Sequence, residues 1–333
     1  MKKFIYTLMG INLQLFAGEL NTNVTTDSGL SAEMKTYYDM TLIDEAQANL
    51  VHDQFAQKRN IPKNGGKKIE FRKFASLPKA LTPLTEGVTP DGKKLSVTAF
   101  EAEVSQYGDY ITQSDVLELT TLDNTIIEAT KILGRQAGLT LDTITRNIMQ
   151  SGTNVFYAPK ADGTAVSSRA GLTDDCTLTV DLVNRVVAFL KKNNAPKING
   201  DYVAIIHPLV AYDLMADERW IEAHKYAQPE NLYSGEIGKI GGVRFIETSE
   251  AKIYDGGVFG CLFLADGAYG TTEITGGGLE TIVKQKGSAG TADPLNQRST
   301  IGWKAMKTAE ILIDAYMVRV ECKTALKEFV EVN

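Results

Sequence analysis

Apolar residues recur at steps of three, four and seven between residues 123 and 150, which is the spacing of one face of a helix. At about 1.5 Å per residue, a helix of this length would extend roughly 40 Å. Charged residues occupy the opposite face, where Glu128 can pair with Lys131 and Asp142 can pair with Arg146. We therefore predict a long spine helix on which other elements pack. Its apolar face comprises Ile126, Leu133, Ala137, Leu141, Ile144 and Ile148.

Two glycines, Gly134 and Gly138, interrupt the predicted spine helix. Each costs about 1 kcal/mol relative to alanine in a helix interior. In one interpretation they bend the helix or allow a strand to approach its backbone closely. In the other the spine is a plain core helix that tolerates both glycines, and the sequence leaves the two interpretations open.

Apolar and polar residues alternate on both sides of a proline-rich stretch. Residues 68–74 and 94–110 have the alternation of strands. Residues 76–92 contain three prolines and two glycines, too many for a central strand. An isolated two-stranded ribbon is only marginally stable in water, so it needs another surface to lie on. We predict a long two-stranded excursion with a proline-rich tip that rests on a neighbouring subunit.

The charges are distributed unevenly around this excursion. Residues 58–73 contain seven Lys or Arg and a single acidic residue, Glu70. Residues 101–128 contain seven acidic residues and no Lys or Arg. The two runs could pair within one chain or between chains. Alternatively, both are solvated faces whose screened charges contribute little.

The N-terminal part is expected to form an arm. A basic start followed by FIYTLMGINLQLFAG has the outline of a short signal peptide, but Asn12 and Gln14 interrupt its apolar part. We therefore favour an arm over a secretion signal. Residues 18–30 are polar and predict a tether. An apolar stripe then predicts a helix from Ser31 to about Gln57.

Alternating helical and strand patterns predict a compact α/β region after residue 176. The final part of the chain is expected to return to the spine helix as one long strand. The predicted elements are helices at 179–193 and 208–226 and strands at 201–207, 242–248, 261–265 and 311–321.

Composition limits the classes of protein that fit. The chain has 333 residues, 43% hydrophobic and 23% charged, which suits a folded protein with more than one core. The net charge is −6, so the basic excess typical of a protein that grips nucleic acid is absent. Without a run of 18 apolar residues, we expect no membrane span. Three cysteines without CxxC spacing predict free thiols in a reducing compartment: Cys176, Cys261 and Cys322.

No stretch of the sequence predicts catalytic, cofactor-binding or metal-binding residues. Residues 87–94 approach a phosphate-binding loop, but Lys94 stands where the motif requires Ser or Thr. Residues 235–242 are glycine-rich without GxGxxG spacing and predict a turn before a strand. No histidine has an HExxH context, which favours structural roles, and no GxSxG is present. The sequence therefore argues against an enzyme.

Four stretches, together with the order of the elements, resemble the major capsid proteins of tailed bacteriophages. These proteins have the HK97-like α+β fold, with an N-arm, an extended β-hairpin loop (E-loop), a P-domain with a long spine helix, and an α/β A-domain. The similarity extends over nearly the whole chain and depends on order and coverage rather than on a single motif. The four stretches are residues 12–18, 202–220, 240–253 and 308–321.

The resemblance implies a function as well as a division of the chain. It implies self-assembly into pentamers and hexamers of an icosahedral shell that encloses double-stranded DNA without sequence-specific binding. Scaffolding and portal proteins would be partners, the shell would be assembled in the host bacterial cytoplasm, and the protein would reside in the virion. The implied parts are an N-arm at 1–57, an E-loop at 58–105, a P-domain at 106–175 and 295–333, and an A-domain at 176–294.

Three further points stay open at this stage. Some relatives form lysine–asparagine crosslinks between subunits, but no local pattern singles out Lys79, Lys93 or Lys94, so no crosslink is predicted. An encapsulin, a nanocompartment shell protein with the same fold, is an alternative. An α/β enzyme that uses residues 176–294 is a second alternative, which a well-formed pocket with convergent polar groups there would favour.

Overall fold

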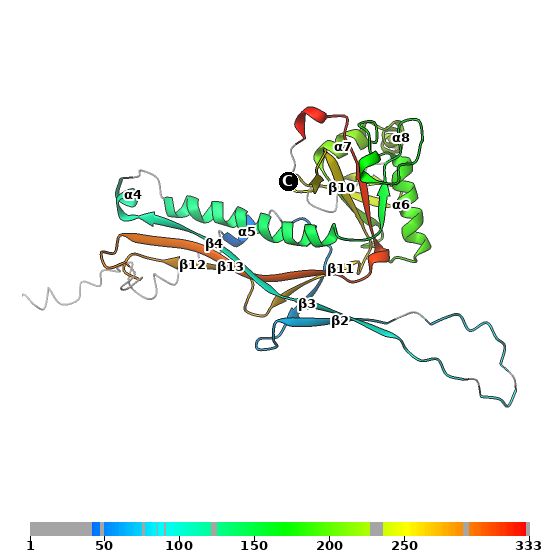
Figure 1. The fold of residues 1–333 in the computed structure, drawn as a ribbon, viewed down its shortest axis with the longest axis horizontal. Helices are drawn as coiled ribbons and strands as arrows, with labels where there is room; N and C mark the ends of the chain where they lie inside the picture. The colour runs from blue at the N-terminus through cyan, green and yellow to red at the C-terminus, as the bar shows by residue number, and fades with distance from the viewer. Residues whose placement is uncertain are drawn as a thin grey trace, which may run out of the picture.

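The computed structural model shows an elongated molecule with three parts (Figure 1). A long sheet carrying the spine helix forms the body, an α/β unit stands at one end, and a two-stranded hairpin projects from beneath that end. The structure describes residues 42–46, 50–74, 77–84, 86–89, 91–120, 125–226, 236–288 and 293–330.

Helix α5, Thr125–Met149, is the predicted spine helix and has 25 residues. Its expected start at residue 123 lies outside the described residues. The predicted pair of Glu128 and Lys131 is present, with 2.9 Å between the carboxylate and the ammonium nitrogen. The apolar face of α5 is buried against the sheet in a cluster that comprises Leu42, Ala129, Leu133, Ala137, Leu141, Ile301, Trp303 and Ala305.

The expectation that Asp142 and Arg146 lie on the exposed face of the spine helix is wrong. Their exposed fractions are 0% and 3%, and the structure pairs each with another segment instead. Asp142 accepts a hydrogen bond from the backbone N–H of His52, and Arg146 donates to the backbone carbonyl of Glu250. These partners lie 90 and 104 residues away in the sequence, so helical periodicity carries no sign of them.

A five-stranded sheet underlies the spine helix, and its longest strand is β13, Arg298–Ile311. Strand β4, Ser105–Ser114, pairs antiparallel with β13 over ten residue pairs. The short helix α4, Asp115–Thr120, follows β4 at the end of the body farthest from the α/β unit (Figure 1). The other strands are β1 (Gln57–Ile61), β11 (Tyr269–Ile274) and β12 (Glu280–Lys284), in the order β1-β11-β13-β12.

The α/β unit is built on a seven-stranded sheet with the order β5-β14-β10-β6-β8-β7, and β9 pairs with β10. Strand β14 lies between β5 and β10, so strands from before residue 176 and after residue 295 belong to this sheet. The strands are β5 (Val155–Tyr157), β6 (Tyr202–Ile206), β7 (Glu236–Ile240), β8 (Val243–Glu247), β9 (Ile253–Tyr254), β10 (Val258–Leu264) and β14 (Met317–Cys322).

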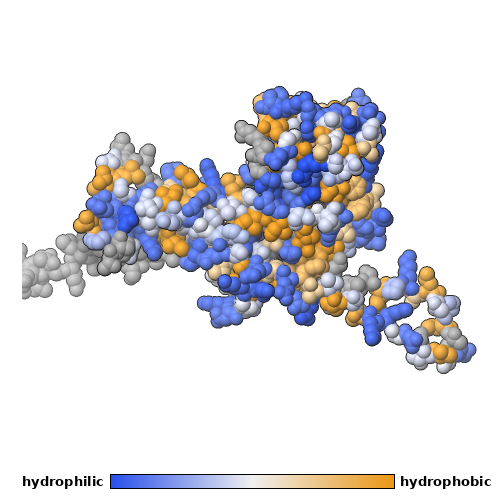
Figure 2. All heavy atoms as spheres, in the orientation of Figure 1, coloured by the Kyte–Doolittle hydropathy of each residue, from blue (hydrophilic) through white to orange (hydrophobic). Residues whose placement is uncertain are grey.

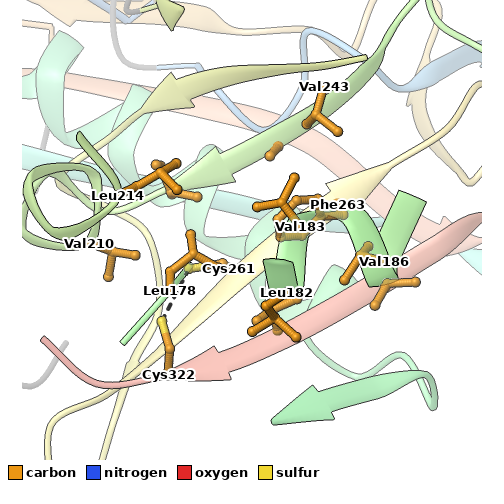
Figure 3. Packing of buried hydrophobic residues seen from close by; sticks show 14 of the residues in the cluster. Leu178, Leu182, Val183, Val186, Val210, Leu214, Val243, Cys261, Phe263 and Cys322 are labelled. Atoms are coloured by element: carbon orange, nitrogen blue, oxygen red, sulfur yellow. Dashed lines mark hydrogen bonds between the residues drawn. The ribbon is translucent and has the colours of Figure 1, made fainter. Parts of the chain in front are cut away.

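Successive side chains of β10 point to opposite faces of the sheet and pack into two different cores. Cys261 and Phe263 pack with Val183 of helix α6, Val180–Lys192, in the larger core (Figure 3). Leu262 points to the other face, where it packs with Met149 at the end of the spine helix. Alternation of this kind lets one buried strand join the helices on one face to the body on the other.

Most predicted elements of the α/β unit are confirmed: α6 (Val180–Lys192), β6, β8 and β10. The single helix predicted at 208–226 is instead two helices, α7 (Pro208–Met215) and α8 (Glu218–Tyr226). Asp217 stands between them and accepts hydrogen bonds from the backbone N–H groups of Arg219 and Val180, at 2.9 and 3.0 Å. The side chain of Asp217 thus begins the second helix and ties it to α6.

The single long strand predicted at 311–321 is wrong. β13 ends at Ile311 in the five-stranded sheet, and β14 begins at Met317 in the seven-stranded sheet. Asp314, between them, accepts a hydrogen bond from the Thr153 backbone N–H at 3.0 Å and one from the Asn154 side-chain amide at 2.9 Å. These contacts hold the chain where it crosses from the body to the α/β unit.

The N-terminal helix predicted to reach Gln57 is also wrong at its end. Residues 42–46 are helical, residues 52–55 form a turn, and β1 begins at Gln57. The part of this helix expected before residue 42, and the tether at 18–30, lie outside the described residues.

The predicted two-stranded excursion is confirmed as an antiparallel hairpin of β2, Lys68–Phe74, and β3, Val97–Glu103. The single strand predicted at 94–110 is wrong, because the chain leaves the hairpin after Glu103 and β4 pairs with β13 in the five-stranded sheet. Seven residue pairs join the strands, from Lys68 opposite Glu103 to Phe74 opposite Val97. Residues 77–84, 86–89 and 91–96, which we call the tip, have no regular secondary structure and project away from the body (Figure 1).

Candidate assembly surfaces

The tip carries apolar side chains that contact nothing large enough to bury them. Figure 2 shows apolar and hydrophilic side chains side by side on this projecting part. Grouped exposed apolar side chains are typical of interaction sites, so the tip is a candidate contact surface. Their exposed fractions are 53% for Leu77, 82% for Leu81, 77% for Leu84, 62% for Val88 and 68% for Leu95.

The base of the hairpin, in contrast, is anchored in the body. Phe71 and Ala102, on one face of the hairpin, are each only 3% exposed. The Arg59 guanidinium lies 5.5 Å from the centre of the Phe71 ring, a cation–π distance. The backbone N–H of Val104 donates to the Lys67 carbonyl at 2.9 Å. The hairpin therefore leaves the body in a fixed direction, while its tip has no partner that buries it among the described residues.

A second group of exposed apolar residues lies at the α4 end of the body. Val116 and Leu119 of α4 are 63% and 82% exposed, and Tyr110 of the preceding strand is 68% exposed. Ser114 caps the helix by accepting from the Leu117 backbone N–H at 3.3 Å. The tip and the α4 end thus place exposed apolar groups at opposite ends of the molecule (Figure 1).

The two spine glycines allow a close contact between helical segments. A Cβ atom on Gly134 would lie 2.8 Å from the backbone oxygen of Leu42, and one on Gly138 would overlap the backbone oxygen of Ala46. The partner is therefore the short helical segment 42–46 and not a strand, as one interpretation had suggested. Both glycines fix where the N-terminal part of the chain joins the spine helix.

Five buried polar side chains attach the turn after that segment to the body. The His52 imidazole Nδ1 lies 2.6 Å from one Asp142 oxygen, and its backbone N–H donates to the other at 2.7 Å. The Lys307 ammonium contacts the Asp53 carboxylate, whose second oxygen accepts from the Thr145 hydroxyl at 2.7 Å. The turn is thereby joined to both the spine helix and strand β13.

Burial raises the pKa of the Tyr269 phenol well above its usual range, so the group stays neutral. Its hydroxyl donates to the His52 backbone carbonyl, next to the buried polar side chains. A neutral donor at this place satisfies a buried carbonyl without adding charge.

A buried carboxylate, Glu321, organises the junction between the body and the α/β unit. Its exposed fraction is 0%, and Arg169 holds it with two hydrogen bonds of 2.8 and 2.6 Å. The same pairing raises the pKa of the Arg169 guanidinium. Arg169 also lies 3.6 Å from the centre of the Tyr254 ring, and the Tyr254 hydroxyl donates to Gln150 at 3.0 Å. The end of the spine helix is therefore tied to the α/β sheet by side chains.

The sequence motifs that resembled chemical sites have structural roles where the structure describes them. Strand β3 begins at Val97, so residues 91–96 lead into a strand and not into the helix that a phosphate-binding loop requires. Gly241 and Gly242, with φ of 62° and 82°, form the turn between β7 and β8, and so the predicted turn is confirmed. His207 caps α7, because its Nδ1 accepts from the Leu209 backbone N–H at 3.1 Å. The side chain of the third histidine, His224, lies outside the described part of the structure.

All three cysteines are buried free thiols, as predicted. The Cys261 and Cys322 sulfur atoms lie 3.8 Å apart on neighbouring strands, although 61 residues separate them in the sequence (Figure 3). Their hydrogen bond and their burial raise the pKa of the Cys322 thiol well above its usual range, so it stays protonated. They act as small apolar groups of the core.

A well-formed pocket with convergent polar groups within residues 176–294 would have favoured the enzyme alternative. A cavity of about 470 Å³ lies beside the spine helix, lined in part by Leu50, Leu141 and Met306. Across the described ranges, no group of three or more His, Cys, Asp and Glu side chains could hold a metal ion. None of the helices in the described part of the chain is long and apolar enough to cross a membrane.

Comparisons with known proteins agree with this geometry. The family described as phage capsid protein matches residues 98–318, about two thirds of the chain. A search of curated proteins finds no match.

Solved structures show the same fold at low sequence identity. The capsid of the cyanophage P-SCSP1u is 14% identical, with a TM-score of 0.63, and the match covers 81% of this chain and 87% of that one. The capsid of Ralstonia phage GP4 is also 14% identical, with a TM-score of 0.63 and coverage of 82% and 88%. The SrpI encapsulin of Synechococcus elongatus PCC 7942 is 10% identical, with a TM-score of 0.55 and coverage of 86% and 90%.

These likenesses establish the HK97-like α+β fold that the sequence predicted, and the family match extends over most of the body and the α/β unit. The match points to a structural role in a capsid. On this evidence the chain belongs to the phage capsid protein family, as a major capsid protein.

Proposed function

We propose that this chain assembles into pentamers and hexamers that form the icosahedral shell of a tailed bacteriophage around double-stranded DNA. The observation that carries the proposal is the projecting tip, whose five large apolar side chains are each more than half exposed. Burying a leucine side chain stabilises a contact by about 2 kcal/mol, so even partial burial of these residues supplies a useful contact energy.

The architecture also favours rings over pairs. The tip and the α4 end lie at opposite ends of the molecule, so a contact that joins unlike surfaces runs head to tail. Head-to-tail contacts of identical subunits form closed rings when the rotation between neighbours closes. Each subunit then makes two such contacts, and modest contacts add around the ring.

We propose the division of the chain that the resemblance implied, with changes suggested by the sheets. The N-arm would end near residue 56, because β1 begins at Gln57 in the five-stranded sheet. The E-loop would comprise residues 62–104. The A-domain would include β5 and β14, because both strands belong to its sheet, and it would end near Leu264, because β11 and β12 belong to the five-stranded sheet of the body.

The partners and location follow from the same proposal. The net charge of −6 suits a wall that encloses DNA without binding its sequence. We propose that a scaffolding protein and a portal protein take part in assembly, that the host bacterial cytoplasm is where the shell forms, and that the protein catalyses no reaction. Buried free thiols are compatible with that reducing compartment.

An encapsulin-type shell is a second candidate, since the SrpI encapsulin shares the fold at a TM-score of 0.55. The content of purified shells separates the two. Nuclease-protected DNA in particles from infected cells supports the virion, whereas a protein cargo without DNA supports the nanocompartment.

The experiment replaces residues 75–96 by a two-residue Asn-Gly turn. Phe74 and Val97 are directly opposite each other, so this turn can close the remaining hairpin. We expect a folded monomer, by circular dichroism and sedimentation, and no rings or shells by negative-stain microscopy. An unfolded product would mean that the tip belongs to a core, and shells like those of the unmodified chain would mean that the tip is dispensable.

A matched pair of variants separates apolar contact from loop shape. Leu81→Ser/Leu84→Ser removes the apolar groups, and Leu81→Ile/Leu84→Ile retains them. We expect only the serine variant to lose assembly. If the two variants assembled to the same extent, an apolar contact at the tip would be contradicted.

A further inference from the structure

The five-stranded sheet has an outer face, which points away from the spine helix. Successive residues of β13 point to opposite faces of the sheet. Ile301, Trp303 and Ala305 pack in the cluster beneath α5. Gly302 and Lys304, which alternate with them, therefore lie on the outer face. An antiparallel sheet commonly keeps one face in solvent, so this face is where a partner can bind.

One row of the outer face lacks its central side chain. Gly302 lies directly opposite both Tyr110 of β4 and Ile282 of β12. Residues directly opposite each other in an antiparallel sheet point to the same face, so two large side chains flank a glycine. A space of about 440 Å³ lies at this row, and Lys284 and Thr300 also line it. We call this space the slot.

The gap at Gly302 is fixed by the backbone. A Cβ atom there would lie 2.7 Å from the Tyr110 Cβ and 2.8 Å from the Asp109 backbone oxygen. A Cβ atom on Gly108 would lie 2.5 Å from the Trp303 backbone oxygen. The two strands therefore approach each other too closely for a side chain at either glycine, and the slot is preformed.

The slot combines apolar walls with one unpaired positive charge. Lys304 pairs with Glu280 at 3.1 Å. Lys284 is exposed and has no carboxylate within 4.0 Å among the described residues. Asp109 serves the other face, where it accepts a hydrogen bond from the Gln136 amide at 2.7 Å. The slot therefore suits an apolar side chain that has an acidic residue close to it.

The tip carries such groups at a matching spacing. Leu84 is 77% exposed. Glu86, two residues later, is also exposed, and no basic side chain lies within 4.0 Å of it in the described ranges. Ile282 and Lys284 are likewise two residues apart. Side chains two residues apart in an extended chain point to the same side, so an extended tip segment would present both groups to the slot together.

The tip and the slot of one molecule point away from each other. Strand β4 begins one residue after β3 ends, and the two strands lead away from the tip (Figure 1). Tyr110 lies 13 residues after Val97, which is roughly 43 Å of extended chain. The hairpin leaves the body on the side of the sheet opposite α5, which is the side of the slot (Figure 1). A head-to-tail neighbour therefore receives the tip that its own chain cannot supply.

We propose that the tip of one copy docks in the slot of a second copy of this chain, with Leu84 in the gap over Gly302 and Glu86 beside Lys284. The inference rests on the proposed assembly into rings, and it names the receiving surface at the α4 end of the neighbour. Burial of the leucine supplies affinity, because a preformed gap removes it from water without rearranging the sheet. The ion pair sets the register of the contact more than its affinity.

A photo-crosslink tests which segment occupies the slot. The photoreactive amino acid p-benzoylphenylalanine replaces Tyr110 in chains grown with ¹⁵N, and these are mixed with unlabelled chains before assembly. After irradiation, we expect mass spectrometry to find the ¹⁵N peptide that contains position 110 joined to an unlabelled peptide from residues 77–89. A crosslink to residues 1–41 or to another part of the chain would overturn the proposal.

An exchange of charges tests the register. Glu86→Lys and Lys284→Glu each place like charges together, and we expect each to reduce the fraction of subunits in rings or shells about fivefold at low salt. The double variant restores opposite charges and should recover most of the loss. The control, Asp91→Lys/Lys191→Glu, changes exposed charges outside the contact and should assemble like the unmodified chain.

A matched pair of variants tests the apolar wall. Tyr110→Phe keeps the ring, and Tyr110→Ser removes it from an exposed position, so circular dichroism should show a folded monomer for both. We expect Tyr110→Ser to reduce assembly about tenfold and Tyr110→Phe to leave it nearly unchanged.

The remaining outcomes also decide the matter. A charge-exchanged double variant no better than the single variants, or equal assembly of the two Tyr110 variants, would show that the tip does not enter the slot. If the unmodified chain forms rings but these tests fail, the inference fails and the proposed function stands. If the unmodified chain forms neither rings nor shells, sedimentation of that chain alone shows that the proposed function itself fails.

Discussion

The buried pair of Lys307 and Asp53 gives the sharpest test of how the N-terminal turn is held. Lys307 is 2% exposed and Asp53 is 8% exposed, and their charged groups are in contact. Lys307→Met removes the ammonium and keeps a side chain of similar length. It leaves the Asp53 carboxylate buried, with the Thr145 hydroxyl as its remaining hydrogen-bond partner among the described residues.

The expected magnitude follows from the desolvation of that carboxylate. Removing one partner of a buried ion pair costs about 3–5 kcal/mol, because the remaining charge is uncompensated. Asp53→Asn/Lys307→Met removes both charges while the asparagine oxygen can still accept from Thr145. We expect this double variant to lie within about 1–2 kcal/mol of the unmodified chain, and thus to be more stable than the single variant.

The assay is urea unfolding of the monomer whose tip has been replaced, so that assembly adds nothing to the measured stability. The chain has two tryptophans, and Trp220→Phe leaves Trp303, which is buried between the sheet and the spine helix, as the fluorescent probe. A loss below about 1 kcal/mol for Lys307→Met would refute a buried, paired charge. A double variant less stable than the single variant would refute the desolvation argument.

Three further predictions concern other parts of the molecule. Gly138→Ala normally stabilises a helix by about 1 kcal/mol, but here the new Cβ overlaps the Ala46 backbone, so we expect net destabilisation and earlier proteolysis near residue 46. Burial lowers the pKa of the His207 imidazole, so the unfolded chain binds more protons than the folded chain near pH 6. The free energy of unfolding should therefore fall as the pH decreases below about 6.5. His207→Asn keeps a capping side chain, and its urea unfolding should depend less on pH. Glu321→Gln weakens the charged hydrogen bonds to Arg169. It should lower the free energy of unfolding of the α/β unit by about 2–4 kcal/mol, measured by thermal or urea unfolding. A loss below about 1 kcal/mol would contradict the role given to this junction.

Periodicity predicted the elements whose burial is set by local spacing. The spine helix, the strands of the hairpin and most of the α/β unit follow patterns of 3.6 or 2 residues, because one face of each packs on a neighbouring layer. The proline-rich composition of the tip also predicted that it could not lie in the centre of a sheet. These features account for the fold class and for the projecting hairpin.

The errors occurred where partners distant in the sequence decide the structure. The predicted N-terminal helix ends early because His52 and Asp53 bond to residues about 90 or more positions away. The long C-terminal strand breaks where Asp314 bonds to a loop 161 residues earlier. Asp142 was expected to be exposed because helical spacing gives no information about a distant histidine. A polar residue within an otherwise apolar region was the available signal, and it is a weak one.

The tip and the α4 end that it is proposed to contact lie on the same chain, and this has a consequence for mutants. Every copy carries the same change, so a defect at one contact recurs at each contact of the ring. A loss of about 0.5 kcal/mol per contact becomes about 3 kcal/mol around six subunits, which exceeds a hundredfold in the equilibrium for closure. Small substitutions in the tip should therefore act as temperature-sensitive lesions, and in mixed rings the loss should grow with the number of altered chains.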